Sequence, residues 1–353
     1  MNQKPQLHAN NHYVPRIYLR SWASSHEKIF TFKTLVTDSR VPYWKENSIR
    51  GVAYHEHLYT RIASGLESDE IERWLDKEFE SPAQEAIQKA ITDQPMTAHD
   101  WKMLIRFLAV QDVRTPARML QAFSRWKTSV PKILKESLDK HHPQLTAANF
   151  NNVTQSIPLH YKTQEIPLKI SATLNPGQEH GTLSAEMVIG RGLWVHSVRH
   201  ILTGSLDVLH NHHWTILKPP AGMYWFTNDD PVTKCDSVNF KLIEDEGGWN
   251  TNGTCIFLPL GPRHLLYTQV GSRVPLRGTK VSPDKARIIQ GLIANGAHRM
   301  IFAHLRDPEI PRLRPRHVSA ATVREEQEQW RNWNDQQIAA EKELWIESSK
   351  KQG

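Results

Sequence analysis

Strand-like patterns occur near both ends of the chain, and helical patterns occur between them. Residues 28–33 (KIFTFK) alternate apolar and polar side chains, which is typical of a strand with one buried face. Residues 255–260 and 264–270 form a second pair of strand patterns, separated by Gly261-Pro262. We therefore predict an α+β fold, with mixed, largely antiparallel β elements from both ends of the chain around a central helical region.

The central region, residues 66–142, is predicted to be helical. Apolar residues recur every three or four positions over Leu66–Ile91, which indicates a helix with one buried face. Pro116 and Pro131 each remove a backbone donor and should bend or break a helix. We therefore expect the stretch that ends near His141 to consist of two or three helices in series.

The second half of the chain continues the same mixture of elements. Leu183–Leu209 and Pro283–Leu305 have the apolar spacing of helices. His213–Lys218 and Met223–Thr227 read as the strands of a hairpin that turns at Pro-Pro-Ala-Gly. Together these segments predict a single α+β domain over residues 1–305.

A charged tail follows the predicted domain. Residues 306–319 are a connector rich in proline and arginine, and residues 320–353 have the pattern of one charged C-terminal helix. Trp330, Trp333 and Trp345 fall near one side of that helix. An aromatic stripe of this kind could bind a protein partner.

Composition excludes several classes of protein. The chain has 353 residues and only two cysteines, Cys235 and Cys255, which excludes a disulfide scaffold and a multi-cysteine zinc ribbon. No segment reaches the roughly 18 consecutive apolar residues of a membrane span, and the N-terminal residues lack a secretory signal, so we expect a cytoplasmic protein without a membrane partner. The Walker loop, the dinucleotide fingerprint and the nucleophile elbow are absent from the sequence.

Several short motifs follow one another in a characteristic order. They are HYVPRIYL from His12, KIFTFK from Lys28, QDVRTP from Gln111, FTNDDPV from Phe226, IFLPL from Ile256, and Asn295. This order resembles the bacterial family known as domain of unknown function 4238, over roughly residues 12–305. The chain departs from the family at Asn228, where serine is usual. The resemblance implies an architecture and no settled activity, although a role in phage defence would suit a bacterial family of this type.

His12 and Asp229 are the candidate centre of a catalytic site. Histidine titrates near neutral pH and can act as a general base. Asp229 ends a strand pattern at an acidic turn, where it could hold a divalent cation together with Asp230. On this interpretation the chain is a phosphodiesterase or nuclease-like hydrolase that uses Mg²⁺ or Mn²⁺.

Further polar residues would complete that site. A bidentate guanidinium can hold phosphate, so Arg114, Arg16 and Arg118 are candidate phosphate ligands, and Arg114 is counted with the catalytic group. Asn295 would orient one of these groups as a further catalytic residue. In-line attack on phosphate depends mainly on such positioning and on neutralisation of charge.

The alternative is a non-catalytic module that binds nucleic acid or protein, in which the histidine and aspartate motifs are structural. Asp and Asn commonly stabilise turns through their own backbone, and a buried histidine can bond to backbone groups. Convergence of His12, Arg114, Asp229 and Asn295 in one open pocket would favour the enzyme. Residues that lie apart, or that are paired internally, would favour the binding module.

A basic stripe is the candidate surface for nucleic acid. The chain carries a net charge of +7 and has a pI of about 9.3, which is a weak indication of nucleic-acid binding. Arg114, Arg118, Arg125 and Lys132 are spaced four, seven and seven residues apart, so on a continuous helix they would lie on one side. Such a stripe could follow the phosphates of a nucleic acid.

Overall fold

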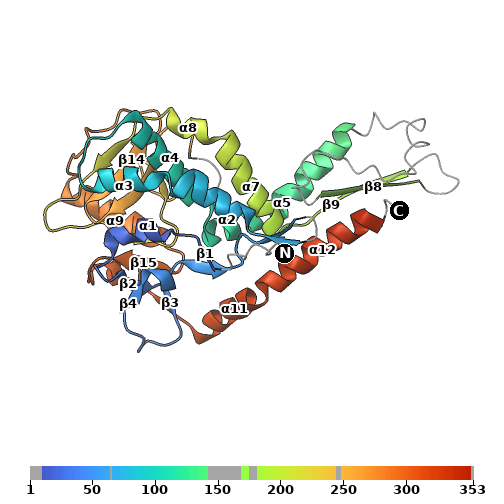
Figure 1. The fold of residues 1–353 in the computed structure, drawn as a ribbon, viewed down its shortest axis with the longest axis horizontal. Helices are drawn as coiled ribbons and strands as arrows, with labels where there is room; N and C mark the ends of the chain where they lie inside the picture. Colours follow the sequence, from blue (N-terminus) through green and yellow to red (C-terminus); the bar gives the residue numbers. More distant parts are fainter. Residues whose placement is uncertain (1–9, 64–65, 142–167, 175–180, 244–247, 351–353) are drawn as a thin grey trace, which may run out of the picture.

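The protein has a body that carries two four-stranded sheets, and an extension on one side of it (Figure 1). The computed structural model describes residues 10–63, 66–141, 168–174, 181–243 and 248–350. The extension contains α5 (Pro116–His141), α12 (Trp333–Lys350) and the ribbon of β8 (Leu168–Leu174) with β9 (Gly181–Met187). The predicted α+β class is confirmed.

The two larger sheets are antiparallel, and they draw on different parts of the chain. In the first, the strand order is β10 (Thr215–Leu217), β14 (His264–Gln269), β13 (Thr254–Gly261) and β12 (Thr233–Asp236). In the second, it is β11 (Thr227–Asn228), β15 (Met300–Ala303), β2 (Lys28–Lys33) and β4 (Trp44–Ser48). The second sheet joins strands from the two ends of the chain, as predicted.

Three smaller strand pairs surround these sheets. They are β1 (Asn10–His12) with β5 (Tyr54–Glu56), β6 (Arg61–Ala63) with β7 (Leu66–Ser68), and β3 (Leu35–Val36) with β16 (His317–Val318). The β3–β16 pair is parallel, and it ties the predicted connector to the N-terminal part of the body.

The helices cover the first sheet and fill the space between the two sheets. Their bounds are α1 (Arg16–Leu19), α2 (Glu70–Leu75) with the π-helix Asp76–Glu80, α3 (Ala83–Ile91), α4 (Ala98–Val113), α7 (Arg191–Gly204), α8 (Leu206–His210), α9 (Pro283–Gly296), α10 (Ile310–Leu313) and α11 (Ala320–Arg331). Strand β13 is buried along its whole length. Ile256 and Leu258 pack with the helical core, whereas Phe257 packs with α9 and the second sheet, because neighbouring strand residues point to opposite faces.

The predicted break at Pro116 is confirmed, and the predicted break at Pro131 is wrong. Helix α4 ends at Val113, and α5 begins at Pro116, whose missing donor is harmless in a first turn. Helix α5 runs through Pro131 without interruption. Pro131 and Lys127, whose carbonyl loses its helical partner, are both exposed, so water can satisfy that carbonyl.

Three other predicted elements are wrong in type or pairing. The segment Leu183–Leu209 begins as strand β9 and becomes helical only at α7, and Pro283–Leu305 is a helix followed by β15. The predicted hairpin does not form, because its two segments supply strands to different sheets. The buried Trp225 precedes β11. The backbone N–H of Trp225 donates to the Pro262 carbonyl, so this residue pairs with the turn between β13 and β14 instead of with β10.

The C-terminal tail is attached to the body through Arg191. The side chain of Arg191 is fully buried at the start of α7, and its guanidinium donates two hydrogen bonds of 3.1 Å to the Glu341 carboxylate of α12. It also donates to Asn334 at 2.7 Å and to the backbone carbonyl of His57 at 3.1 Å. The predicted helix is thus present as α11 and α12, which are separated at Asn332 and docked on the body.

Two tail tryptophans also contact other segments of the chain, which affects the predicted partner surface. The Trp330 ring lies 4.2 Å from the His55 ring, and the Trp333 ring stacks on Phe123 at 6.1 Å. The side chain of Trp345 lies outside the described residues. Trp330 and Trp333 are therefore used in packing within the chain, and binding of a protein partner through this helix stays a prediction.

Replacement of Glu341 by alanine tests the attachment of the tail. Arg191 would keep its charge in a fully buried position without its carboxylate, so we expect a loss of about 3 kcal/mol in the free energy of unfolding. Urea denaturation followed by circular dichroism measures this loss. Glu328→Ala, at an exposed position on α11, is the control and should change stability by less than about 0.5 kcal/mol. Equal effects of the two variants would contradict this role of Arg191.

Candidate functional site

The motif that begins at His12 packs on the motif that begins at Phe226. Pro15 directly precedes α1. A backbone N–H at this position would have no acceptor within the helix, so the lack of an N–H in proline costs no helical hydrogen bond. The buried Tyr18 of α1 shares a 2.7 Å hydrogen bond with the Thr227 hydroxyl, and the Trp22 indole donates to the Trp225 carbonyl at 3.0 Å. The N-terminal motif is thereby fixed to the edge strand β11 of the second sheet.

His12 is half-buried, and both its ring and its backbone have partners. The ring Nε2 lies 3.3 Å from the Arg50 carbonyl, which only accepts, so Nε2 carries the hydrogen and donates it. Burial lowers the pKa of His12 below its usual value, and the nearby charge of Arg16 contributes in the same direction. Arg16 itself is exposed. The His12 ring is therefore neutral at neutral pH, and one of its two nitrogens is bonded within the protein.

The Arg114 guanidinium is fully buried and connects three segments of the chain. It donates hydrogen bonds to the backbone carbonyl of His12, to the Glu80 carboxylate and, at 3.1 Å, to the Tyr59 hydroxyl. The same hydroxyl donates to the Arg114 carbonyl at 2.7 Å. Although burial alone would lower the pKa of Arg114, the negative charge of Glu80 raises it.

A second carboxylate lies near Arg114. Glu72 Oε2 is 3.9 Å from the guanidinium, and this oxygen is buried without a hydrogen-bond partner. Burial raises the pKa of Glu72 to about 8, although Arg114 opposes that shift. Arg114 therefore neutralises Glu80 in a direct contact and stabilises charge on Glu72 less strongly.

The Asp229 carboxylate holds the beginning of strand β15 in place. Its oxygens accept hydrogen bonds from three consecutive backbone N–H groups, those of His298 at 2.8 Å, Arg299 at 2.7 Å and Met300 at 3.0 Å. The side chain is only 2 % exposed. Burial raises the pKa of Asp229 to about 7, and the three N–H groups act in the opposite direction. Both carboxylate oxygens are thus used by the protein's own backbone.

Asp230 belongs to a separate network, which it forms with Arg118. Its carboxylate accepts hydrogen bonds from the Thr115 hydroxyl at 2.7 Å and from Arg118 Nε at 3.2 Å. Arg118 also donates to the Val232 carbonyl at 3.2 Å. Burial raises the pKa of Asp230, and the Arg118 charge opposes that shift. Arg118, a predicted phosphate ligand, therefore contacts a buried carboxylate of its own chain.

Asp112 continues this network to strand β12. Its Oδ2 accepts from Lys234 Nζ at 2.9 Å and from the Trp249 indole at 2.7 Å, and its Oδ1 lies 3.5 Å from Arg118. Burial would raise the pKa of Asp112, but the charges of Lys234 and Arg118 lower it. The two carboxylates, Asp112 and Asp230, are thus balanced by two cations.

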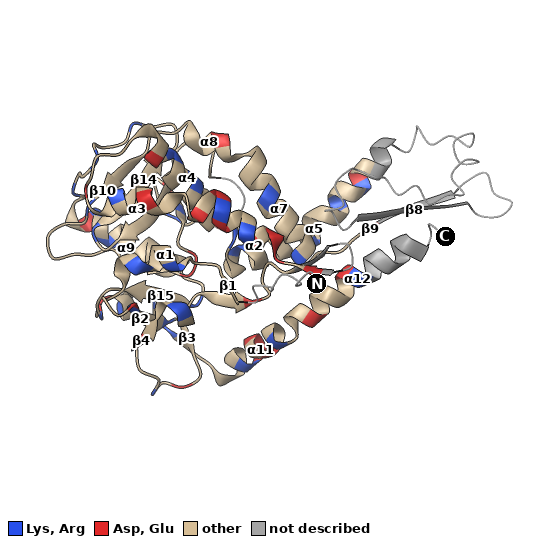
Figure 2. Ribbon diagram, viewed as in Figure 1, with Lys and Arg blue, Asp and Glu red and all other residues tan. Residues whose placement is uncertain are grey.

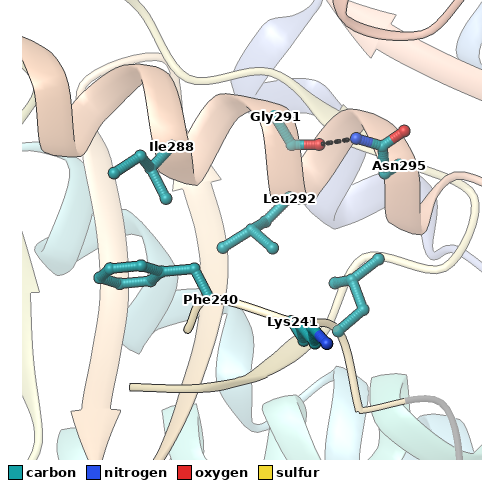
Figure 3. Close-up of a pocket in the computed structure, with 7 residues that line it drawn as sticks. Phe240, Lys241, Ile288, Gly291, Leu292 and Asn295 are labelled. Atoms are coloured by element: carbon teal, nitrogen blue, oxygen red, sulfur yellow. Dashed lines mark hydrogen bonds between the residues drawn. The ribbon is translucent and has the colours of Figure 1, made fainter. Parts of the chain in front are cut away.

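Asn295 does not belong to this site. It lies near the end of α9, where its side-chain amide donates to the Gly291 carbonyl of its own helix at 2.8 Å (Figure 3). It lines a separate cavity of about 460 Å³ between α9 and the segment 240–242. The sequence-based placement of Asn295 beside His12 and Asp229 is not supported by any contact among the described residues.

The predicted site residues His12, Arg114, Asp229 and Asp230 thus have hydrogen-bond partners within the chain. His12 and Arg114 meet through a backbone carbonyl, and Thr115 links the neighbouring position to Asp230. The structure shows no group of three His, Cys, Asp or Glu side chains that could hold a metal ion in the part of the chain that it describes. The predicted metal site at Asp229 and Asp230 is therefore not supported, because these carboxylates already bind backbone N–H groups, a hydroxyl and a guanidinium.

Sequence reasoning missed several members of these networks. Thr115 and Asp112 lie inside the motif that begins at Gln111, next to the arginine that was singled out. Glu80 lies in the region predicted to be helical over residues 66–142. The signal that could have found them is the need of each buried arginine for a carboxylate, since an unpaired buried charge is strongly destabilising.

Comparisons with known proteins confirm the family resemblance. The sequence model of a family described as protein of unknown function (DUF4238) matches residues 10–307. The chain belongs to the DUF4238 family. No curated protein and no solved structure matches the chain. The motifs through which the sequence resembles DUF4238 include those that meet in the networks of Arg114, Asp229 and Asp230. Among the described residues, no helix has both the length and the apolar character to cross a bilayer.

Replacement of Arg114 by methionine tests whether its network supports the fold. The change leaves Glu80 mostly buried without its cation, so we expect a loss of about 3 to 5 kcal/mol in the free energy of unfolding. Arg16→Met is the matched control at an exposed position and should alter stability by no more than about 0.5 kcal/mol. Chemical denaturation measures both values, and a loss below about 1 kcal/mol in Arg114→Met would argue against a structural role.

The pH dependence of stability tests the state of Asp229. Its carboxyl has an unfolded-state pKa of 3.8 and a folded-state pKa of about 7, so the folded protein keeps a proton that the unfolded chain has lost between these values. Stability from this group is therefore present below pH 3.8 and is lost as the pH rises to about 7. Relative to Asp229→Asn, the wild-type protein should lose stability between pH 3.8 and about pH 7.

Urea denaturation of both proteins at several pH values gives this difference directly. Because Asn cannot titrate, the other ionisable groups affect the two proteins alike and largely cancel in the comparison. If the difference instead rises with pH, the three backbone N–H groups dominate over burial, and the carboxylate is ionised in the folded state throughout.

Proposed function

We propose that this chain is a non-catalytic nucleic-acid-binding module, in which the His12, Arg114 and Asp229 motifs are structural. The observation that supports this proposal is the internal pairing of the candidate catalytic groups. Asp229 uses both oxygens on three backbone N–H groups, and Arg114 uses its guanidinium on Glu80, Tyr59 and the His12 carbonyl. A general base or a phosphate ligand needs atoms that a substrate can reach.

The surface that supports nucleic-acid binding is the outer part of α5. Of the predicted basic stripe, Arg114 and Arg118 are used inside the protein, whereas Lys132 is exposed and Arg125 is half-buried. Lys127 and Lys135 are exposed on the same helix. Glu136 is the acidic residue within this part of α5, and its 3.9 Å contact with Lys132 is exposed and therefore weak.

The position of α5 makes these charges accessible. The helix extends away from the sheets of the body, and lysine and arginine positions are marked along its ribbon (Figure 2). Arg125, Lys132 and Lys135 are separated by seven and three residues, so they share one side of the helix over nearly three turns. Such an arrangement can contact several phosphates without reading the bases, which is the usual basis of non-specific binding.

Fluorescence anisotropy with labelled single- and double-stranded DNA and RNA tests this proposal. The variant Lys127→Gln/Lys132→Gln/Lys135→Gln should bind more weakly at low salt. Its slope of log affinity against log salt for duplex DNA should be smaller by up to about 3, because each lost phosphate contact removes almost one unit. The control Lys45→Gln/Lys241→Gln/Lys280→Gln removes equal charge from exposed positions elsewhere.

These binding measurements, together with a cleavage assay, distinguish a nucleic-acid-binding module from a hydrolase. Equal weakening by the two triple variants would reject α5 as the binding surface, and the lack of salt-dependent binding in the wild-type protein would reject the module. The same oligonucleotides incubated with Mg²⁺, Mn²⁺ or EDTA test the hydrolase. Metal-dependent cleavage that is lost in a folded Asp229→Asn variant would overturn the proposal in favour of a nuclease.

A further inference from the structure

The two cysteines of the chain lie opposite each other in the first sheet. Cys235 of β12 and Cys255 of β13 are direct partners in the antiparallel ladder, and both are free thiols. The Cα atoms of such partners are about 4.5 to 5.5 Å apart, which lies within the range of about 4.4 to 6.8 Å that a disulfide spans. The backbone pairing thus holds the two cysteines at a Cα separation that a disulfide can span.

Polar groups beside this pair distinguish it from two cysteines that only fill the core. The Tyr267 hydroxyl of β14 lies 3.3 Å from Cys255 Sγ, and Lys285 Nζ of α9 lies 5.6 Å from the centre of the Tyr267 ring. The neighbouring Cys235 thiol lowers the pKa of Cys255 to about 7, and the Tyr267 hydroxyl and the Lys285 charge add to this effect. The Tyr267 hydroxyl contacts Cys255, so we take Cys255 as the thiol that ionises first.

Access to the pair depends on a short irregular segment. The thiols are almost fully buried, but β12 is the edge strand of its sheet, and Leu242 forms a single backbone bridge to Cys235. Leu242 also lines the cavity shown in Figure 3, together with Phe240. The segment 240–242 thus contacts the cysteine strand and borders solvent-accessible space, so a molecule as small as a peroxide needs only a local opening to reach the sulfur atoms.

We propose that Cys235 and Cys255 are a peroxide-sensitive pair that forms a reversible cross-strand disulfide. The Cys255 thiolate attacks one oxygen of hydrogen peroxide, the O–O bond breaks, and hydroxide leaves, which gives Cys255 sulfenic acid. The Cys235 sulfur then attacks the Cys255 sulfur, the S–O bond breaks, and water leaves. In total, two thiols and one hydrogen peroxide give one disulfide and two waters, and a dithiol such as dithiothreitol returns the pair to thiols.

Mass spectrometry of the full-length protein tests the proposal. The reduced wild-type protein, treated with a small molar excess of hydrogen peroxide and then alkylated, should lose two hydrogen atoms in intact mass and yield a Cys235–Cys255 cross-linked peptide. Dithiothreitol should restore both thiols. Thiols that stay reduced in the folded wild-type protein, or cross-links that form only between molecules, would overturn the proposal.

Single variants test the assigned order of the two steps. Cys235→Ser should accumulate a sulfenic acid on Cys255 that dimedone traps, because the second sulfur is missing. In Cys255→Ser, the remaining Cys235 should react about tenfold more slowly at neutral pH, because less of it is thiolate. Circular dichroism checks that each variant is folded. Faster trapping on Cys235 than on Cys255 would reverse the assigned roles and overturn this part of the proposal.

Discussion

The buried guanidinium of Arg114 is the interaction on which the rest of the structure depends. It joins the N-terminal motif at His12, the π-helix at Glu80 and the loop at Tyr59, and it lies at the junction of α4 and α5. Arginine suits this position because its planar group carries five donors and stays charged when buried. A lysine would supply one point charge and could not satisfy the same three acceptors in their fixed directions.

Polar and charged contacts continue from Arg114 to neighbouring segments of the chain. Thr115 follows Arg114 and binds Asp230, while Asp229 binds three backbone N–H groups at the start of β15. Arg299, one of those three donors, also pairs with Glu326 of α11. A path of polar contacts therefore runs from the Asp229 turn to the C-terminal helices. Arg191 and Glu341 form a second attachment of the same kind.

Sequence patterns correctly predicted the helices and strands that depend mainly on their own residues. The alternation in 28–33 and the two apolar runs around Gly261-Pro262 were sufficient to predict β2, β13 and β14, and Pro116 marked the start of α5. The same patterns failed for β11, which has two residues and exists because Trp225 and Phe226 are buried in the core beside it. Whether so short a strand forms depends on tertiary packing, and it cannot be predicted from the strand's own residues.

The site was harder to predict than the fold, because a chemical motif does not show whether its atoms remain available. His12, Arg114 and Asp229 have the residue types of a phosphodiesterase, and only their burial and partners distinguish a structural network from a catalytic one. The carboxylate of Asp229 is the decisive case. Its two oxygens accept hydrogen bonds from three successive N–H groups, and a metal ion that used the same lone pairs would break those bonds. The backbone donors would then be buried without acceptors, and each would cost about 1 to 3 kcal/mol. The Asp229 carboxylate is therefore better suited to holding the start of β15 in place than to exchanging a ligand.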